Sequence, residues 1–597
     1  MSLVVQKFGG SSVATAERIM AAARRAIRAS QAGNQVVVVV SARGDTTDEL
    51  IELAREITEH PPSREMDMLL STGEQISIAL MAMAVQALGH PAISFTGQQV
   101  GIVTDSTHTK ARIKNISTER LRQGLDKGNI IIVAGFQGMD EHDDITTLGR
   151  GGSDTTAVAL AAALKHDSGG AHVTVDCEIY TDVDGVYTTD PRLIPEARKL
   201  PAISYDEMLE LASLGAGVMH SRSIEFAKKF GVPLQVRNSF SDVEGTWIIP
   251  ETPEMQALPV SGVALAKEEA RVSIDGVPDR PGVSHQVFSA IAEKNLVVDM
   301  IAQNAGAHGK ADIGFTVLKN DLPATLAVVR PLAAELDATV MYQEGLSKVS
   351  IVGVGMRTHT GVAERMFSAL AADRVNIQMI TTSEIKISVL VDKPDGTRAL
   401  RAVHQAFGLH ALRPATSSHR PTVASDALQV RDIVQALASM EDIVVSDVVL
   451  DTDQGRITLF NVPDQPGVCA ALFSGIARAG IVVDVIVQNL SAPGAAELSI
   501  SVPRADLNRA LALARQLVAE IGPSCQAVAD PDIAKVSVLG VGMRTHTGVA
   551  RRMFGALAER GINIAMISTS EMRVSVVVEL SRGSEALDAL KRTFQLV

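Results

Sequence analysis

The sequence predicts an α/β catalytic region followed by four small α+β units, and three observations carry that prediction. The chain has 597 residues, which is too many for one hydrophobic core at the usual domain size of about 150 residues. Over residues 1 to about 250, apolar β-rich runs alternate with helical stretches, which is typical of a parallel sheet between layers of helices. In the second half, long segments recur almost unchanged at a nearly fixed spacing.

The composition indicates a globular protein and argues against nucleic-acid binding and membrane insertion. Hydrophobic residues make up 46% of the chain and charged residues 21%, the mixture of an ordinary globular protein. Acidic residues outnumber basic ones by 68 to 55 and aromatic residues are only 3%, so we expect no nucleic-acid partner. No apolar run approaches the roughly 20 residues of a membrane span, and the N-terminus reads as a strand, not a signal region. Three cysteines without metal-like spacing indicate no metal site and a reducing compartment, so we expect a cytoplasmic protein.

The first 250 residues show the alternation element by element. We expect strands at 4–5, 36–40, 130–133 and 172–175, and helices at 14–29, 74–88 and 155–164. In a parallel sheet, ligands gather at the carboxyl ends of the strands, so the loops there are the places where chemistry is expected.

The first such loop, Lys7–Ser12, joins a strand to a helix through two glycines. Gly9 and Gly10 would let an anion approach the backbone, the helix N-terminus would supply free N–H groups, and Lys7 would add a positive charge. The loop is therefore a candidate phosphate cradle, although it is not a Walker A loop. A tight strand-to-helix turn with a solvated lysine is the alternative.

A second loop, Thr146–Thr155, places Arg150 among three glycines that open a helix. A guanidinium in that position can grip a carboxylate with two hydrogen bonds. Asp154 can cap the helix or pair with Lys7. A capped helix with a flexible entry is the alternative.

Two more loops carry charged residues beside turn signals. In Ser71–Glu74, we expect Glu74 to open a helix, where its carboxylate could receive an ammonium group. In Glu178–Arg192, Asp-Gly and Asp-Pro turns bring further charged and aromatic side chains together.

The second half is a duplication, and each copy is itself double. Gly353–Ala363 recurs letter for letter as Gly540–Ala550, and Val277–Val283 recurs with one change as Val462–Val468. Every unit starts with a short apolar run, passes through a turn into a helical pattern and ends in alternating strands. After a catalytic region at 1–250, we expect units at 251–340, 341–411, 429–525 and 526–597, with a linker at 412–428.

These units resemble ACT domains, small regulatory modules of ferredoxin-like α+β fold that bind amino acids where two modules pair. The loops of the first half, with two further segments, occur in the order that resembles the aspartate kinases of the amino acid kinase family. In sequence they are Lys7-Phe-Gly-Gly-Ser, Val40-Ser-Ala, Leu70-Ser-Thr-Gly-Glu, Gly135-Phe-Gln-Gly, Thr147-Leu-Gly-Arg-Gly-Gly-Ser-Asp and Glu178-Ile-Tyr-Thr-Asp. The resemblance implies a three-layer α/β sandwich followed by four ACT domains.

The resemblance also implies a reaction, the ATP-dependent phosphorylation of the side-chain carboxylate of L-aspartate to 4-phospho-L-aspartate. That reaction begins lysine, threonine and methionine biosynthesis. The matching catalytic residues are Lys7, Arg150 and Asp154, the last orienting the lysine. The matching aspartate-binding residues are Ser41, Glu74, Leu125, Asp126, Arg150 and Ser153, with Arg150 on the α-carboxylate and Glu74 on the ammonium. The matching ATP-binding residues are Lys7, Phe8, Gly9, Gly10, Thr181, Asp182, Tyr187 and Arg192, and Mg²⁺ would bridge ATP oxygens with few protein ligands.

The ACT resemblance implies feedback inhibition by lysine and threonine and a homodimer formed through these domains. In the family, an effector is held by the Pro-Asp turn, by a Gln-Asn pair and by an Asn-Ile pair of the partnering module. We therefore expect one set from Asp279, Gln303, Asn304, Asn376 and Ile377, and a second from Asp464, Gln488, Asn489, Asn563 and Ile564.

Two other functions stay open from the sequence. The chain could be an amino acid kinase that acts on another carboxylate, such as glutamate, or a non-catalytic amino-acid sensor built from ACT modules. The intact set of Lys7, Arg150 and Asp182 argues against the sensor.

Overall fold

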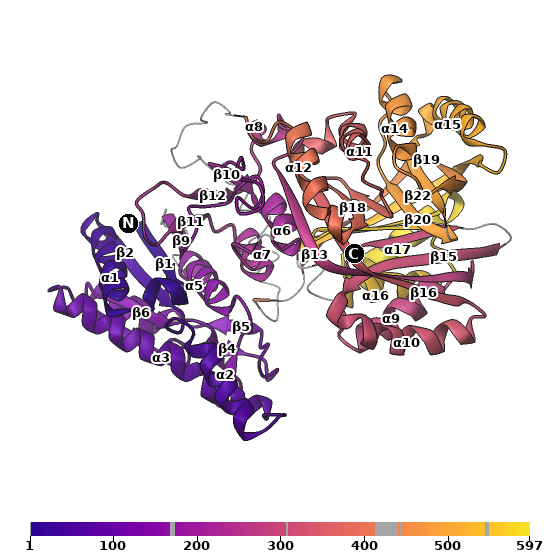
Figure 1. Cartoon of the computed structure of the whole chain (residues 1–597). Coiled ribbons are helices and arrows are strands. Elements are labelled where there is room, and N and C mark those ends of the chain that lie inside the picture. Colours follow the sequence, from indigo (N-terminus) through magenta and orange to yellow (C-terminus); the bar gives the residue numbers. More distant parts are fainter. Residues whose placement is uncertain are drawn as a thin grey trace.

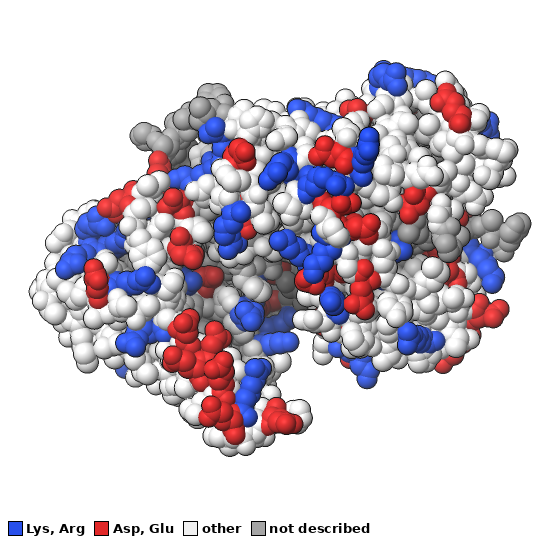
Figure 2. Space-filling view, in the orientation of Figure 1, with Lys and Arg blue, Asp and Glu red and all other residues white. Residues whose placement is uncertain are grey.

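The computed structural model describes residues 2–167, 174–215, 217–305, 309–411, 440–441, 444–492, 494–541, 543 and 548–596. An N-terminal domain and a body formed by the repeated units lie side by side (Figure 1). On the face shown in Figure 2, basic and acidic side chains are interspersed over both parts. The expected linker at 412–428 lies outside the described residues.

The N-terminal domain is built on an eight-stranded sheet of order β10-β12-β11-β9-β1-β2-β6-β3. Neighbouring strands are parallel except for β11 and β12. The strands are β1 (Ser2–Phe8), β2 (Asn34–Val40), β3 (Ala92–Phe95), β6 (Ile130–Ala134), β9 (Thr174–Thr181), β10 (Ala202–Ser204), β11 (Leu234–Asn238) and β12 (Thr246–Ile249). The four strands expected from the sequence correspond to β1, β2, β6 and β9. A small second sheet contains β4 (Ile102–Thr104), β5 (Ile113–Ile116), β7 (Gln137–Met139) and β8 (Ile145–Thr147).

Helices cover both faces of the large sheet, which gives the three layers that the sequence predicts. The alternation of side chains in β2 separates the two cores: Val36, Val38 and Val40 pack with one set of helices, and Val37 and Val39 pack with the other. The first set is α1 (Ala16–Gln31) and α3 (Ser63–Ala87), and the second includes α5 (Gly152–Asp167). Helices α2 (Thr46–Ile57), α4 (Glu119–Asp126), α6 (Tyr205–Ser213) and α7 (Ser221–Phe230) complete the domain.

Helix α3 corrects one expectation, because Glu74 does not open a helix but lies near its middle. The Ser-Thr-Gly segment before Glu74 resembles a turn, yet Ser71 and Thr72 donate their hydroxyls to the carbonyls of Met68 and Leu69 inside the helix. By length and composition α3 could cross a membrane, but such a helix is also typical of a protein core, and this one packs against α1 and the sheet.

The repeated units share one twelve-stranded sheet of order β14-β15-β13-β16-β18-β17-β20-β21-β19-β22-β24-β23. The first copy contains β13 (Gly262–Pro278), α9 (Val283–Glu293), β14 (Ile301–Ala305), β15 (Lys310–Leu318), α10 (Leu322–Glu335), β16 (Thr339–Val352), α11 (Val362–Ala372), β17 (Met379–Ser383), β18 (Lys386–Asp392) and α12 (Gly396–Ala406). The second contains β19 (Val444–Pro463), α14 (Val468–Arg478), β20 (Ile486–Ala492), β21 (Ala495–Pro503), α15 (Leu507–Ile521), β22 (Gln526–Val541), α16 (Gly548–Glu559), β23 (Met566–Thr569), β24 (Arg573–Glu579) and α17 (Gly583–Thr593). A short helix, α8 (Pro253–Gln256), precedes them.

The two units within a copy are interleaved through long shared strands. The start of β13 pairs with the end of β16, from Gly262 opposite Val352 to Lys267 opposite Ser347, whereas the end of β13 pairs with β15. The first residues of β13 therefore belong to the sheet of the second unit, although they precede the first unit in the sequence. Strands β19 and β22 join the third and fourth units in the same way.

Although strands pair within each copy, the hydrophobic cores under the helices are shared across the duplication. The first and fourth units share one core, where α9 packs on α16 and the rings of Phe288 and Phe554 lie 5.8 Å apart. The second and third share another, where α11 packs on α14 and the rings of Phe367 and Phe473 lie 5.0 Å apart. Each pair thus joins one unit from each copy.

Candidate active site

The site is at the carboxyl ends of β1, β2, β6 and β9, where backbone hydrogen bonds bring four loops together. The amide of Ser41 donates to the carbonyl of Phe8 at 3.1 Å, and that of Gly135 to Val40 at 3.0 Å. The amide of Gly9 donates to the carbonyl of Tyr180 at 3.3 Å. The fold therefore assembles in one place the loops that the sequence singled out.

Lys7 and Asp154 form an ion pair in this site. The Nζ of Lys7 lies 2.7 Å from Oδ1 of Asp154, and each side chain is only about a tenth exposed. Lys7 is the penultimate residue of β1, and Asp154 is in the first turn of α5. The pair is the one expected from the sequence, and it holds a positive charge at the glycine loop.

Of the two glycines in the loop after Lys7, Gly10 is needed for close packing, whereas Gly9 has room for a side-chain carbon. A Cβ on Gly10 would lie 2.8 Å from the carbonyl oxygen of Ala42, and one on Gly9 would lie 3.4 Å from Nζ of Lys7. A 3-10 turn follows, and α1 begins only at Ala16, later than expected. Phe8 itself is fully buried and stacks on Tyr180, so its side chain is not available to a ligand.

Glu74 is a buried carboxylate with half of its hydrogen-bonding capacity unused. Its Oε1 accepts from the amide of Ala42 at 2.9 Å, whereas Oε2 is buried and has no hydrogen-bond partner among the described residues. Burial raises the pKa of Glu74 to about 7. An unpaired buried oxygen of this kind suits a cationic ligand.

The loop before α5 presents the other substrate candidates. Gly149 and Gly151 adopt positive φ angles of 76° and 71°, and Arg150 between them is exposed and makes no ion pair within the described chain. Ser153 is buried against Gly135, where an added Cβ would lie 2.6 Å from the serine Oγ. Ser41 is half-buried.

The nucleotide candidates lie after β9 and are more exposed. Thr181, the last residue of β9, donates its hydroxyl to the exposed Asp182 at 3.1 Å, next to the point where Tyr180 contacts Gly9. Tyr187 is half-buried, and burial together with Asp184 raises its pKa. Arg192 pairs with Asp190 at 2.8 Å and extends into solvent.

Leu125 and Asp126 are not part of this site. They end α4, which leads through a short turn into the first residue of β6, whereas the site follows the last residue of that strand. Leu125 packs in the hydrophobic core and Asp126 is exposed. The two residues therefore lie at the opposite edge of the sheet, and assigning them to the substrate was wrong.

The regulatory residues come together in sets that differ from the expected ones. Asn563 donates to Asp279 at 2.7 Å, and Gln303 donates to the carbonyl of Ile564 at 2.6 Å. The matching set joins Asn376 to Asp464 at 2.8 Å and Gln488 to the carbonyl of Ile377 at 3.1 Å. The expected grouping within each copy was wrong, because both copies carry the same motif and the sequence alone does not say which copy supplies the Asn-Ile partner.

The asparagines of the two Gln-Asn pairs, Asn304 and Asn489, take no part in the hydrogen bonds just described. Asn489 is 1% exposed and lies against Gly314 of the first unit. The side chain of Asn304 lies outside the described residues.

Sequence reasoning missed two residues that brace the site. Asp67 is fully buried on α3 and accepts from the hydroxyl of Thr147 at 2.5 Å and from the amide of Thr109. It precedes Glu74 by seven residues, two helical turns, so the helical period could have revealed it. The second residue, Arg222, is held by contacts far apart in the sequence, and no local signal marks it.

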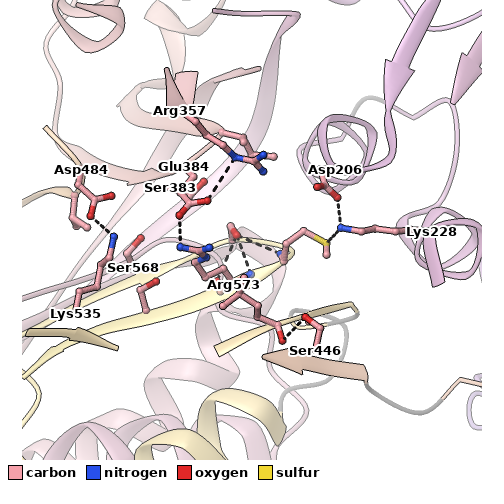
Figure 3. Close-up of a pocket in the computed structure, with 17 residues that line it drawn as sticks. Asp206, Lys228, Arg357, Ser383, Glu384, Ser446, Asp484, Lys535, Ser568 and Arg573 are labelled. Carbon is pink, nitrogen blue, oxygen red and sulfur yellow. Dashed lines mark hydrogen bonds and ion pairs between the residues drawn. The ribbon is translucent and has the colours of Figure 1, made fainter. Parts of the chain in front are cut away.

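The N-terminal domain meets the repeated units through buried and half-buried charges. On α6, Glu207 accepts from the amide of Val354 at 3.0 Å, and Glu210 lies 2.8 Å from Nζ of Lys386. Burial raises the pKa of Glu210, opposed by Lys386. Beside them, Figure 3 shows a polar pocket in which Glu384 lies between two arginines.

Comparisons with known proteins agree with this architecture. The family model for the amino acid kinase family matches residues 2–238, and the model for an ACT domain matches residues 349–407 and 536–594. The aspartate kinase Ask_LysC of Stutzerimonas stutzeri is 51% identical over 413 residues, which are 69% of this chain and 98% of that protein. The chain belongs to the aspartate kinases of the amino acid kinase family.

Solved aspartate kinases extend the match. The crystal structure of aspartate kinase from Synechocystis is 42% identical, covers 100% of this chain and 98% of its own, and has a TM-score of 0.52. Aspartokinase III of E. coli is 25% identical over 68% of this chain and 99% of its own. It was solved with aspartate and ADP (TM-score 0.57) and with lysine and aspartate (TM-score 0.53). The N-terminal domain is thus the kinase domain, and the repeated units are the ACT domains.

Proposed function

We propose that the site transfers the γ-phosphoryl group of ATP to the side-chain carboxylate of L-aspartate and releases 4-phospho-L-aspartate. The observation that carries the proposal is the unpaired buried oxygen of Glu74, close to the Lys7–Asp154 pair. The backbone of Ala42 connects the two, since its amide binds Glu74 and its carbonyl abuts Gly10. An ammonium group at Glu74 would therefore place the rest of a small amino acid beside the glycine loop.

The α-carboxylate of aspartate needs a positively charged partner, and Arg150 can supply it. Arg150, exposed and without an ion-pair partner in the described residues, is available to grip the α-carboxylate. Ser41 and Ser153 offer hydroxyls near the same loops. The nucleophile is already a carboxylate, so positioning and charge stabilisation are sufficient and no strong general base is required.

ATP would lie over the glycine loop and the segment after β9. Lys7, held by Asp154, would stabilise charge on the transferring group together with the amides of Gly9 and Gly10. The side chains of Thr181, Asp182, Tyr187 and Arg192 are the remaining nucleotide candidates, and Phe8 would support the loop from the core. Mg²⁺ would neutralise phosphate charge, and since the described residues contain no cluster of three or more potential ligands, we assign it to ATP oxygens.

The paired ACT domains would supply feedback inhibition by lysine and threonine. The lysine complex of E. coli aspartokinase III supports the first effector. Each predicted effector site joins an aspartate in a turn at a helix N-terminus to an asparagine from the other copy, so it offers groups for both the ammonium and the carboxylate of an amino acid. Effector and substrate would antagonise each other reciprocally.

In the cell, we propose a cytoplasmic homodimer that performs the first step towards lysine, threonine and methionine. The three cysteines are all free, in agreement with a reducing compartment. The acidic net charge of −13 agrees with a small-molecule enzyme without a nucleic-acid partner.

The direct test is ADP release with a panel of amino acids. We expect turnover with L-aspartate, little with L-glutamate, and none without an amino acid. Lysine and threonine, added singly and together, should inhibit, more strongly together. A preference for glutamate over aspartate would overturn the proposal.

A further inference from the structure

A short segment before β19, formed by Met440 and Glu441, docks on the kinase domain. The amide of Met440 donates to the carbonyl of Lys114 at 2.9 Å, and Lys229 donates to the carbonyl of Met440 at 2.7 Å. Next to it, Glu441 accepts from the amide of Ile113 at 2.7 Å. The segment comes just before β19, the long strand that the third and fourth ACT domains share.

Glu441 forms a bidentate pair with Arg222 of α7. The Nε of Arg222 lies 2.7 Å from one carboxylate oxygen of Glu441, and Nη2 lies 2.5 Å from the other. The side chains are 15% and 6% exposed, so water screens the pair little. Such a pair fixes the plane of the guanidinium as well as its charge.

The same guanidinium holds the loop that carries Arg150. Its Nη1 donates to the carbonyl of Leu148 at 2.6 Å, and Nη2 donates to the carbonyl of Ala111 at 2.6 Å. Leu148 stands two residues before Arg150, and the amide of Ala111 donates to the carbonyl of Thr147 at 2.9 Å. Arg222 thus binds two neighbouring backbone segments at the base of the loop, one at Ala111 and one at Leu148.

The residue that follows Arg150 in the loop, Gly151, packs against the N-terminus of α7, the helix that carries Arg222. His220, the N-cap of α7, lies so close to Gly151 that a Cβ there would be 2.3 Å from the histidine Cβ. Arg150 therefore lies between two residues, Leu148 and Gly151, that α7 contacts directly. The backbone on both sides of Arg150 is thus anchored to α7, by Arg222 at Leu148 and by His220 at Gly151.

We infer that Glu441 is a positioning residue for aspartate binding, acting through Arg222 on the loop that carries Arg150. The inference rests on the proposed role of Arg150 in gripping aspartate. Without the carboxylate, a nearly buried guanidinium loses its counter-ion and the partner that fixes its plane, so the hydrogen bond to Leu148 loses its geometry. The segment at Glu441 then connects the second copy of the duplicated region, which begins with β19, to the substrate loop. It does so without contacting the substrate itself.

The test compares Glu441→Gln with a matched ion-pair variant. Asp206→Asn removes the partner of Lys228, which also lies on α7 but faces the polar pocket of Figure 3 and not the loop. Glu441→Gln should raise KM for aspartate about three- to thirtyfold, while KM for ATP stays near wild type. Its Tm should fall, because a nearly buried guanidinium loses its counter-ion, so both KM values are measured well below the Tm of the variant. Asp206→Asn should leave KM for aspartate within about twofold.

A double variant shows whether the effect passes through the loop. In an Arg150→Ala background, Glu441→Gln should add almost nothing to KM for aspartate, because the group that it positions is gone. The inference is overturned if the two effects multiply, if KM for ATP rises equally, or if Glu441→Gln leaves KM for aspartate unchanged while Arg150→Ala raises it. If Arg150→Ala itself leaves KM for aspartate unchanged, the proposed substrate role fails and the inference falls with it.

Discussion

Lowering the pH should weaken aspartate binding through Glu74. The carboxylate must be ionised to pair with an ammonium group, and burial raises its pKa to about 7 in the free enzyme. With that pKa, the ionised fraction falls from about nine tenths at pH 8 to about one tenth at pH 6. We therefore expect kcat/KM for aspartate to fall about tenfold over that range.

The assay is ADP release at subsaturating aspartate, with KM for ATP measured at each pH to separate titration of the nucleotide. The matched variant is Glu74→Gln, which keeps the shape and cannot ionise. It should lose about 2–5 kcal/mol in kcat/KM for aspartate and show no remaining fall between pH 8 and 6. A pH-dependent fall that persists in the glutamine variant would refute the reasoning.

The same shift makes an independent prediction about stability. The folded-state pKa of Glu74 is raised above its unfolded value of about 4.5, so the folded protein binds more protons between pH 4.5 and 7. Stability contributed by the protonated group is therefore present below that window and is lost as the pH rises through it. Glu74→Gln should raise Tm more at pH 8 than at pH 5, as thermal unfolding at both pH values would show.

Three other predictions follow from the contacts. Lys7→Met should lower kcat by about 10²–10³ in a protein that still folds, and near-normal turnover would remove Lys7 from the mechanism. Arg150→Ala should cost about 2–5 kcal/mol in kcat/KM for aspartate, and a loss confined to KM for ATP would contradict its assignment. Asp279→Ala and Asn563→Ala should weaken inhibition non-additively if they form one site, whereas additive effects on the inhibitor midpoint would argue against the cross-copy pairing.

The kinase fold was accessible from the sequence because its signals are local. Valine-rich runs, glycine loops and the helical period mark β1, β2 and α5 directly, and the ends of parallel strands meet at one edge. The ion pair of Lys7 with Asp154 could be expected for that reason. Glu74 was found, but its place within a 25-residue helix was not, since hydroxyl-to-carbonyl bonds inside the helix override the turn signal.

What the sequence could not supply depends on contacts between distant segments. Two near-identical copies give two equally good ways to pair Asp279 with an asparagine, and only the packing of α9 on α16 decides for Asn563. The shared strand β13 likewise follows no local pattern, because its two halves serve different units. Arg222 is recognisable only once Leu148 and Glu441 are seen on either side of it.

The pairing of ACT domains across the duplication has a consequence for how regulation depends on the amount of enzyme. If the two copies were separate polypeptides, each shared core would form only when two molecules met, and dilution would dissolve the effector sites. Joined in one chain, the partners see each other at an effective concentration on the order of millimolar, far above the level of most enzymes. Effector sensitivity should therefore stay constant on dilution, and the aromatic faces around Phe288 and Phe554 are already occupied in every molecule.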